Sequence, residues 1–528
     1  MTAGLRVARI LLTDPLDAEG VHVLRAAGHD VVDGSALSGA ARDAEIAKAE
    51  GWVIRSGTRI TAEDIAKAKR LRAIGRAGVG VDNVDLAAAT ARGVAVFHAP
   101  TGNITSAAEQ AWALMLACAR RVNEADAGMK QGTWDRKLEG VELAGKTLFL
   151  VGLGRIGRMM AQRAQAFEMD VIGYDPFVTP DAAKAMGVTW VALDDGLARA
   201  DVVSLHTPLT AQTRHVIDAG RLACMKSSAI LVNAARGPLI DPASLLVALE
   251  AGRLRAAGLD VWEDEPPKDW ALAKHKRVVA APHLGASTRE AQAKAAIQAC
   301  ERLVAFLATG DSGLAVNAQA AVDNQTRPWV ALAESLAGFG VHLLREPLTD
   351  VMVAASAGLE AKALQVHALV GALRASADGE GDINAINAPG QASERGWSVA
   401  GRVLPGKDDP KRIAITLQAG KQTLTVEGTH TPHYGSRVTR LDGFDVDFRP
   451  EGRFLVTRHR DVPGVLARIT AALATHKVNV ANVSLARDHA NGTAMAVIQV
   501  DGAVPVAVRD ELRAVDAILE AHRVRVLT

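Results

Sequence analysis

The chain has 528 residues, a length that allows three to four domains of about 150 residues and exceeds what one hydrophobic core usually serves. Hydrophobic residues make up 49% and charged residues 23%, which excludes a disordered, collagen-like or disulfide-scaffold protein. The 60 Lys and Arg residues balance 59 Asp and Glu residues, so no global field would gather nucleic acid or an anionic membrane. Any anion site must therefore be local.

The three cysteines, Cys118, Cys224 and Cys300, are far apart and form no CxxC pair. They fit neither a disulfide framework nor a zinc or other metal site, and we expect buried, reduced thiols. The longest apolar run, residues 111–119, is well short of the roughly 20 residues of a membrane helix. Since the N-terminal segment has no secretory cleavage pattern, we expect a cytoplasmic protein.

Short β-rich runs alternate with helical patterns along the first third of the chain, and Gly or Asp ends each run. This alternation is typical of βαβ units with a parallel sheet. A second series of the same kind begins at residue 146. We therefore expect two α/β lobes in tandem.

The remaining chain changes character near residue 316. Residues 316–450 read as helices followed by alternating strands, which predicts an α+β domain. Residues 451–528 follow the order β-α-β-β-α-β, which is typical of a ferredoxin-like fold. The expected fold class is thus mixed α/β, with two α/β lobes and two smaller C-terminal domains.

A glycine motif marks the second lobe. Gly152, Gly154 and Gly157 follow an apolar strand and open a helix, and Asp175 ends the next strand. A GxGxxG motif alone is weak, but this order of strand, glycines, helix and acid is the Rossmann fingerprint. The glycines would let a pyrophosphate approach the helix N-terminus, and Asp175 would favour NAD over NADP. The structural alternative is a tight turn that packs helix on strand.

Polar residues follow the later strands of the same lobe: Thr207, Arg236, Asp260, Glu265 and His283. Ligands of such sheets lie beyond the carboxyl ends of the strands, so these residues are expected to share one site. Hydride transfer from a 2-hydroxy acid needs a cation for the carboxylate, a base for the hydroxyl proton and a partner for that base. Arg236, His283 and Glu265 suit these roles. Singly, each also reads as an ordinary loop or surface residue.

The blocks VGLGRIGRMMA, LVNAARGPLID, GLDVWEDEP and APHLGAST resemble those of the D-isomer-specific 2-hydroxy-acid dehydrogenases. The blocks VIRSGT, IGRAGVGVDNVDL, TGNITSAAE and WDRK are similar to those of the D-3-phosphoglycerate dehydrogenases, in their long form with intervening and ACT domains. The resemblance implies NAD-dependent oxidation of D-3-phosphoglycerate to 3-phosphohydroxypyruvate, the first step of L-serine biosynthesis. It implies two Rossmann-like or flavodoxin-like lobes: a substrate-binding lobe over 1–98 with a return segment, 286–315, and an NAD-binding lobe over 99–285. It also implies that Arg236, Glu265 and His283 are catalytic.

The resemblance assigns further site residues. The substrate phosphate and carboxylate would receive donors from Arg55, Ser56, Arg76, Asn103 and Arg136, although Arg55 and Arg76 also fit simple surface solvation. The NAD site would be lined by Gly152, Gly154, Arg155, Ile156, Gly157, Asp175, Thr207, Ala234, Asp260, Gly285 and Ala286. The chain departs from the common family pattern at Val79, Trp262 and Pro238, none of which removes a catalytic group.

The C-terminal run from Arg458 to Asp488 resembles an ACT domain. The resemblance implies that His459, Asp461 and Asn479 bind serine as a feedback effector between the ACT domains of neighbouring subunits, in a homodimer or homotetramer. The alternative is a purely structural dimerisation module. In the middle domain, Arg437 and Arg440 form a small basic group that could bind a second anion.

Two other functions remain open from the sequence. The first is a glyoxylate or hydroxypyruvate reductase on the same scaffold. The arginines expected to bind the substrate and the ACT-like region argue against this function. The second is an NAD-sensing, corepressor-like binding protein. No nuclear-localisation run or recruiting tail supports it. No nucleic acid or membrane partner is expected for the enzyme.

Overall fold

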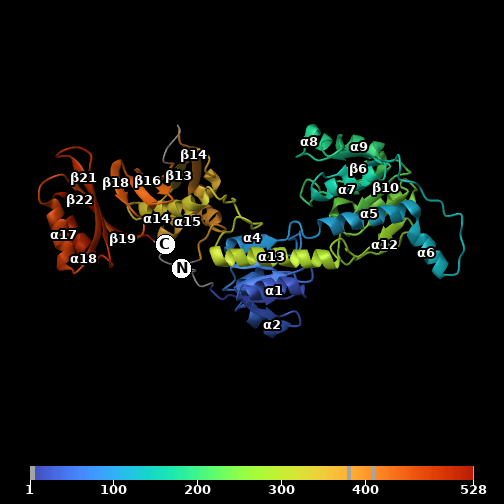
Figure 1. The fold of residues 1–528 in the computed structure, drawn as a ribbon, viewed down its shortest axis with the longest axis horizontal. Coiled ribbons are helices and arrows are strands. Elements are labelled where there is room, and N and C mark those ends of the chain that lie inside the picture. Colours follow the sequence, from blue (N-terminus) through green and yellow to red (C-terminus); the bar gives the residue numbers. More distant parts are fainter. Residues whose placement is uncertain (1–5, 377–381, 406–410, 527–528) are drawn as a thin grey trace.

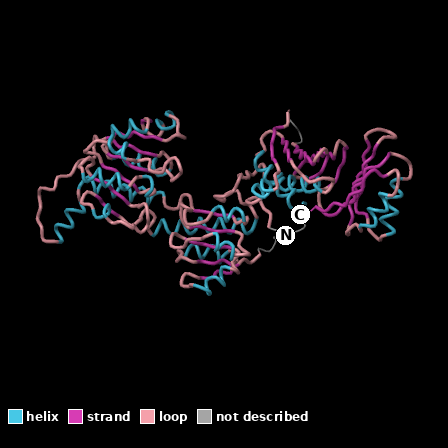
Figure 2. Tube along the Cα trace, turned by 180° about the vertical axis from the view of Figure 1, so that it is seen from behind, coloured by secondary structure: helices cyan, strands magenta, loops and turns pink. Residues whose placement is uncertain are grey.

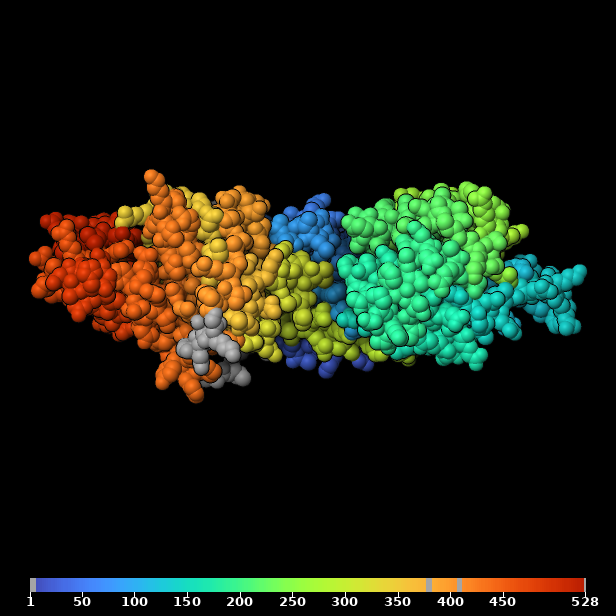
Figure 3. All heavy atoms as spheres, turned by 90° about the horizontal axis from the view of Figure 1, so that it is seen from above, coloured from blue at the N-terminus to red at the C-terminus, as the bar shows by residue number. Residues whose placement is uncertain are grey.

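The computed structural model describes residues 6–376, 382–405 and 411–526. Four sheets follow one another along an elongated molecule (Figure 1). The first lobe lies between the second lobe and the C-terminal half, as the view from above also shows (Figure 3). Among the described residues, no helix is both long enough and apolar enough to cross a membrane.

The first lobe is a parallel five-stranded sheet in the order β2-β1-β3-β4-β5. The order reverses beside β1, and ligands of open α/β sheets bind at the carboxyl ends of strands near such a switch point. The strands are β1 (Arg9–Leu12), β2 (Asp30–Asp33), β3 (Gly51–Ile54), β4 (Ala73–Arg76) and β5 (Ala95–His98). The helices are α1 (Ala18–Ala26), α2 (Gly39–Ile46), α3 (Ala62–Lys67) and α4 (Leu86–Ala91).

The second lobe is a parallel seven-stranded sheet in the order β12-β11-β10-β9-β6-β7-β8, with its switch point between β6 and β9. The strands are β6 (Thr147–Val151), β7 (Asp170–Tyr174), β8 (Thr189–Trp190), β9 (Val202–Leu205), β10 (Ile230–Asn233), β11 (Ala256–Leu259) and β12 (Val278–Ala280). The helices are α7 (Arg155–Ala166), α8 (Pro180–Lys184), α9 (Leu193–Arg199), α10 (Ala219–Cys224), η1 (Gly237–Leu239), α11 (Pro242–Glu250) and α12 (Ala271–Lys274).

Two helices carry the chain between the lobes: α5 (Ile104–Arg120) leads out of the first lobe, and α13 (Arg289–Thr309) returns to pack on α1, β4 and β5. They approach closely, since a Cβ on Gly102 would lie 2.8 Å from the Cα of Ala295. After α5, helix α6 (Val122–Lys130) and the coil that follows project away from the second lobe (Figure 1).

The C-terminal half contains a mixed six-stranded sheet, β14-β13-β15-β16-β17-β18, and an antiparallel four-stranded sheet, β20-β21-β19-β22. The second follows the expected β-α-β-β-α-β order, so the predicted fold class is confirmed. The strands are β13 (Asp350–Ala355), β14 (Ser398–Val403), β15 (Arg412–Ala419), β16 (Gln422–Thr431), β17 (Gly435–Leu441), β18 (Phe444–Phe448), β19 (Gly452–Arg460), β20 (Val480–Arg487), β21 (Thr493–Val500) and β22 (Ile518–Val526). The helices are α14 (Arg327–Val341), α15 (Ala361–Ser376), α16 (Ala388–Glu394), α17 (Val465–Thr475) and α18 (Val506–Arg513).

The two C-terminal sheets share one core (Figure 2). The rings of Phe339, Phe448 and Phe454, which come from α14, β18 and β19, lie with centroids 5.2 to 5.5 Å apart and are almost fully buried. Helices α17 and α18 cover the other face of the four-stranded sheet. Because buried aromatic contacts of this kind resist separation, the two C-terminal sheets form one packed body.

Two expectations from the sequence are wrong. Cys224 is exposed, whereas Cys118 and Cys300 are buried as expected, and burial raises the pKa of these two thiols to about 12. The basic group of the middle domain is also neutralised by β18, since Arg437 pairs with Asp447 and Arg440 lies 3.7 Å from Asp445. These carboxylates leave no surplus charge there for a second anion.

Candidate active site

His283 and Glu265 form a hydrogen-bonded pair after the last strands of the nucleotide-binding lobe. His283 Nδ1 lies 2.6 Å from Glu265 Oε2 and, since a carboxylate only accepts, carries the proton. Desolvation pushes the pKa of Glu265 upward, but the hydrogen bond and positive charge of His283, with Arg236 beyond, outweigh it and hold the pKa below its ordinary value. Glu265 is therefore ionised at neutral pH and can stabilise an imidazolium.

Arg236 follows β10 and reaches across the junction of the two lobes. Its Nε donates to Asp82 Oδ2 at 3.2 Å, and its NH1 donates to the carbonyl of Ala235 at 2.7 Å. A Cβ on Gly80 would lie 2.2 Å from Arg236 NH2, so a side chain there would displace this guanidinium group. Asp82 is not among the residues predicted from the sequence, although the glycine-rich run before it was a usable signal.

Arg76 ends β4 and is largely buried beside Arg236 and Arg55. Its Nε has no hydrogen-bond partner among the residues that the structure describes. Burial, and then the repulsion of Arg236, lowers the pKa of Arg76 to about 10, so the group stays charged at neutral pH. A buried cation without full compensation costs free energy, which a bound anion would recover.

The other predicted substrate residues fall into two groups. Ser56 lies next to Arg55 in the loop after β3, and Asn103 stands at the start of α5 with a buried Oδ1 that has no partner among the described residues. Arg136 is exposed on the coil after α6, which projects away from the lobe junction (Figure 1). One chain therefore brings Arg55, Ser56, Arg76 and Asn103 toward the junction but leaves Arg136 outside it.

The glycine loop after β6 leaves room for a ligand at one position. A Cβ on Gly152 would meet the carbonyl of His206 at 2.6 Å, and one on Gly157 would meet the carbonyl of Gly152 at 2.1 Å. A Cβ on Gly154 would meet nothing within 4 Å. Gly154 is also the N-cap of α7 and makes no side-chain capping bond, so the first amides of α7 can bind a pyrophosphate.

Asp175 follows β7 and braces this loop. Its Oδ2 accepts from the amide of Leu153 at 2.9 Å, and its Oδ1 accepts from the amide of Phe177 at 2.9 Å. Each carboxylate oxygen can accept a further bond, which suits a ribose diol and disfavours a phosphate. The residues present therefore fit NAD.

The remaining predicted cofactor residues surround the same edge of the sheet. Thr207 lies beside Gly152, Ile156 packs into the lobe's core, and Arg155 donates to the carbonyl of Pro100 at 3.0 Å. The others follow strand ends or the His283 turn: Ala234, Asp260, Gly285 and Ala286. The Asp260 side chain is fully buried and accepts from Gln110, a residue for which the sequence offered no motif.

The departures from the family pattern leave the local backbone contacts intact. The carbonyl of Val79 contacts His98 Nδ1 at 2.7 Å, so this backbone is held without a hydroxyl. The indole of Trp262 donates to the carbonyl of Ala281 at 3.0 Å, which ties the Glu265 loop to the segment before His283. Pro238 stands in η1, directly after Arg236 and Gly237.

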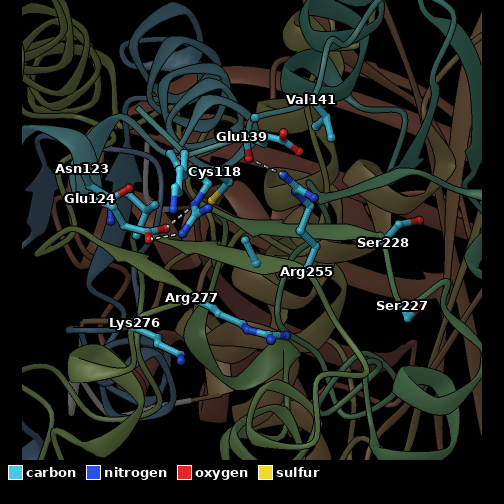
Figure 4. Close-up of a pocket in the computed structure, with 15 residues that line it drawn as sticks. Cys118, Asn123, Glu124, Glu139, Val141, Ser227, Ser228, Arg255, Lys276 and Arg277 are labelled. Atoms are coloured by element: carbon cyan, nitrogen blue, oxygen red, sulfur yellow. Dashed lines mark hydrogen bonds and ion pairs between the residues drawn. The ribbon is translucent and has the colours of Figure 1, made fainter. Parts of the chain in front are cut away.

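A larger cavity lies elsewhere in the second lobe (Figure 4). It measures about 730 Å³ and sits at the amino ends of β10, β11 and β12, the edge opposite to the catalytic pair. Its walls carry Arg255, Lys276 and Arg277 beside Glu139. A smaller apolar cavity of about 470 Å³ includes His283, Glu265 and Trp270 in its lining. Chemistry, rather than volume, therefore identifies the candidate active site.

The predicted regulatory residues occupy two ends of the four-stranded sheet. His459 and Asp461 stand at the end of β19, and Asp461 lies 3.5 Å from the guanidinium of Arg487. Asn479 precedes β20 at the opposite end, where its Nδ2 donates to Asp501 at 2.5 Å. A single chain therefore does not bring Asn479 to Asp461.

Comparisons with known proteins agree with this geometry. The chain is 39% identical over 530 residues to the D-3-phosphoglycerate dehydrogenase of Mycobacterium bovis, with 98% of each chain covered. It is 37% identical over 514 residues to that of Methanocaldococcus jannaschii, covering 96% of this chain and 98% of the relative. The chain belongs to the D-3-phosphoglycerate dehydrogenase family. It is an NAD-dependent dehydrogenase.

Family models extend the match along the D-3-phosphoglycerate dehydrogenase chain. Residues 112–285 match the D-isomer specific 2-hydroxyacid dehydrogenase NAD binding domain, 325–442 the D-3-phosphoglycerate dehydrogenase intervening domain, and 453–517 the ACT domain. A glyoxylate reductase from Paecilomyes thermophila is similar over 58% of this chain and 96% of its own, with 29% identity and a TM-score of 0.52. A D-lactate dehydrogenase from Aquifex aeolicus, complexed with NAD and lactic acid, covers 57% and 95%, with 29% identity and a TM-score of 0.50.

The open space at Gly154 generates a test of the cofactor site. We expect Gly154→Ala to weaken NADH binding at least about tenfold, because the new methyl group would stand where the pyrophosphate must approach the backbone. Thermal stability should stay unchanged, since the methyl group meets no protein atom within 4 Å. NADH fluorescence titration and thermal melting measure the two effects. Gly502→Ala, in an equally open but remote position, should change neither; unaltered NADH affinity in Gly154→Ala would contradict the assignment.

Proposed function

We propose that the protein oxidises D-3-phosphoglycerate to 3-phosphohydroxypyruvate with NAD, the first step of L-serine biosynthesis. The excess of positive charge at the lobe junction carries this proposal. Arg76 has a buried Nε without a partner among the described residues; Arg236 and Arg55 repel it, and Asp82 and Asp14 attract it, so three cations face two acids. A substrate with a phosphate and a carboxylate supplies two anionic groups, whereas lactate or glyoxylate supplies one and leaves this cluster under-compensated.

The catalytic chemistry follows from the residues at the junction. NAD, when bound, supplies the hydride acceptor. Arg236 binds the substrate carboxylate and polarises the oxygen on C2. His283 takes the hydroxyl proton at Nε2, because its Nδ1 is held by Glu265 at 2.6 Å. Glu265 stabilises the imidazolium that forms, while Arg55 and Arg76 hold the phosphate.

Arg136 can contact the substrate only if a second copy of the chain supplies it. It stands on the projecting coil, where the neighbouring Trp134 side chain is 76% exposed. Large exposed aromatic side chains on a protruding segment are typical of an interface. We infer that this coil packs on a second subunit and offers Arg136 to that subunit's substrate cleft. A homodimer suffices for this exchange, and a homotetramer can contain it. A cytoplasmic location stays a prediction.

Serine is proposed as a feedback effector at the ACT domain. His459 and Asp461 lie at one end of the sheet and Asn479 at the other, so a site containing all three requires two ACT domains. Two edge strands β20 running antiparallel would bring Asn479 of one copy toward Asp461 of the other. Asp461 would accept from the α-ammonium group of the amino acid. Serine would then act by shifting the arrangement of the lobes.

A glyoxylate or hydroxypyruvate reductase is the second candidate function, favoured by the structural similarity to a glyoxylate reductase over 58% of the chain. The intervening and ACT domains lie outside the chemistry that such a reductase needs. A corepressor-like role has no support beyond the shared nucleotide-binding lobe.

A substrate panel tests the function directly. We expect NADH formation with D-3-phosphoglycerate to exceed that with D-glycerate and D-lactate by at least about a hundredfold in kcat/KM, since each lost charged contact costs about 2 kcal/mol or more. Glyoxylate and hydroxypyruvate are assayed in the reverse direction with NADH. Preference for glyoxylate over 3-phosphohydroxypyruvate would establish the reductase instead.

Removing the base should separate chemistry from binding. His283→Ala should lower kcat by roughly 10²-fold or more while NADH still binds, because the imidazole handles the proton and not the cofactor. Glu265→Gln should lower kcat in the same direction, since the imidazolium loses its carboxylate partner. Exposed His433, remote in the middle domain, provides the control variant His433→Ala, which should keep wild-type kinetics. Wild-type turnover in His283→Ala would remove that residue from the mechanism.

The regulatory residues should affect inhibition but not catalysis. Asp461→Ala and Asn479→Ala should relieve inhibition by serine and leave uninhibited turnover intact, because both residues lie in the ACT domain rather than at the lobe junction. Initial rates at increasing serine concentration, for wild type and both variants, measure this. Equal serine sensitivity in all three proteins would refute the proposed effector site.

A further inference from the structure

A buried carboxylate holds the turn that carries His283. The side chain of Asp260 has 0% exposure. Its Oδ1 accepts from the amide of Leu284 at 2.8 Å, its Oδ2 accepts from the amide of Gly285 at 2.8 Å, and its carbonyl accepts from the amide of His283 at 2.7 Å. His283 has a φ of 57°, a conformation that residues other than glycine rarely adopt, so contacts from outside must hold the turn.

Gln110 supplies the side-chain donor to this carboxylate. It lies on α5, and its Nε2 donates to Asp260 Oδ1 at 3.0 Å. Among the residues that the structure describes, the other donors to the Asp260 carboxylate are the two backbone amides. A buried carboxylate without a paired cation depends on such donors for its charge. Removing one would free the carboxylate to move.

A second contact links α5 to the same stretch of chain. One turn before Gln110, Ser106 lies with its hydroxyl 2.7 Å from that of Thr288. Thr288 is the N-cap of α13 and accepts from the amide of Ala291. Residues 283–288 are thus tied to α5 at both ends. Since α5 connects the two lobes, a shift of this helix would change the orientation of His283.

We propose that Gln110 is a positioning residue for the dehydrogenase reaction: through Asp260 it holds the 283–285 turn so that His283 keeps Nδ1 on Glu265 and Nε2 toward the substrate. The inference rests on the proposed function. Gln110 contacts neither substrate nor cofactor in this scheme. Its effect on turnover passes through Asp260, because a small displacement of a catalytic base lowers the rate steeply.

Two substitutions distinguish positioning from packing. Gln110→Leu keeps the bulk and removes the donor, and we expect kcat to fall about tenfold or more. Gln110→Glu introduces a carboxyl group that donates only when protonated. Its kcat should approach wild type near about pH 6 and fall progressively toward about pH 9, where two carboxylates would face each other in a buried site.

Gln298→Leu is the matched control. Gln298 lies on α13, and its Nε2 donates to the hydroxyl of Thr101 at 2.6 Å. The variant therefore also removes a glutamine hydrogen bond near the helices that connect the two lobes. This hydrogen bond does not involve Asp260. We expect this variant to keep the kcat and the pH profile of wild type. If the loss of any hydrogen bond near the helices that connect the two lobes lowered kcat, Gln298→Leu and Gln110→Leu would lower it alike.

The measurement is kcat for D-3-phosphoglycerate across pH in wild type and the three variants, with thermal melting to confirm folding. A pH-dependent loss in Gln110→Glu that Gln298→Leu lacks supports the inference. Wild-type profiles in both Gln110 variants, or equal losses in Gln110→Leu and Gln298→Leu, overturn it while the proposed function stands. If Gln110→Leu fails to fold, the profile of Gln110→Glu decides. No turnover by wild type overturns the proposed function and the inference together.

Discussion

A guanidinium buried without its full set of partners constrains the junction of the two lobes. Arg76 is charged at neutral pH; Arg236 and Arg55 repel it and Asp82 and Asp14 attract it, so three cations face two acids at the junction. The nearby acids do not cancel this excess of positive charge. Asp82 approaches Arg236 from an exposed position, and Asp14 accepts from the amide of Arg55 at 2.5 Å. Such an arrangement is costly in the free protein and becomes favourable when an anion fills it. The choice of substrate therefore originates in charge that the fold leaves uncompensated.

The glycines of the loop after β4 leave space for the guanidinium groups of two arginines. A Cβ on Gly78 would lie 1.4 Å from Arg76 NH1, and a Cβ on Gly80 would lie 2.2 Å from Arg236 NH2. Neither glycine has a positive φ, so the requirement concerns space and not backbone freedom. The bare loop lets two guanidinium groups from different lobes approach one another. A substitution there would alter substrate binding through the arginines, without touching the substrate.

The sequence predicts much of the fold because parallel strands buried on both faces are apolar runs that end at Gly or Asp. The proximity of His283 and Glu265 could be predicted for a related reason, because the carboxyl ends of such strands meet at one edge of the sheet. The contacts of Gln110 and Asp82 could not, because their partners lie 150 and 154 residues away and depend on how the lobes pack. Motif similarity likewise gives the type of residue at Arg136 but does not say which copy of the chain uses it.

The C-terminal body contacts the first lobe close to one end of β5. Asn384 Nδ2 donates to the carbonyl of Gly93 at 2.9 Å, just before β5, and Ile386 is buried in the core of the substrate lobe. At the other end of β5, His98 Nδ1 lies 2.7 Å from the carbonyl of Val79, in the loop that follows Arg76. A short, buried strand thus separates the docked C-terminal body from the arginine loop. A displacement of the C-terminal body would therefore reach the loop after Arg76 through β5, without passing through the glycine loop that follows β6.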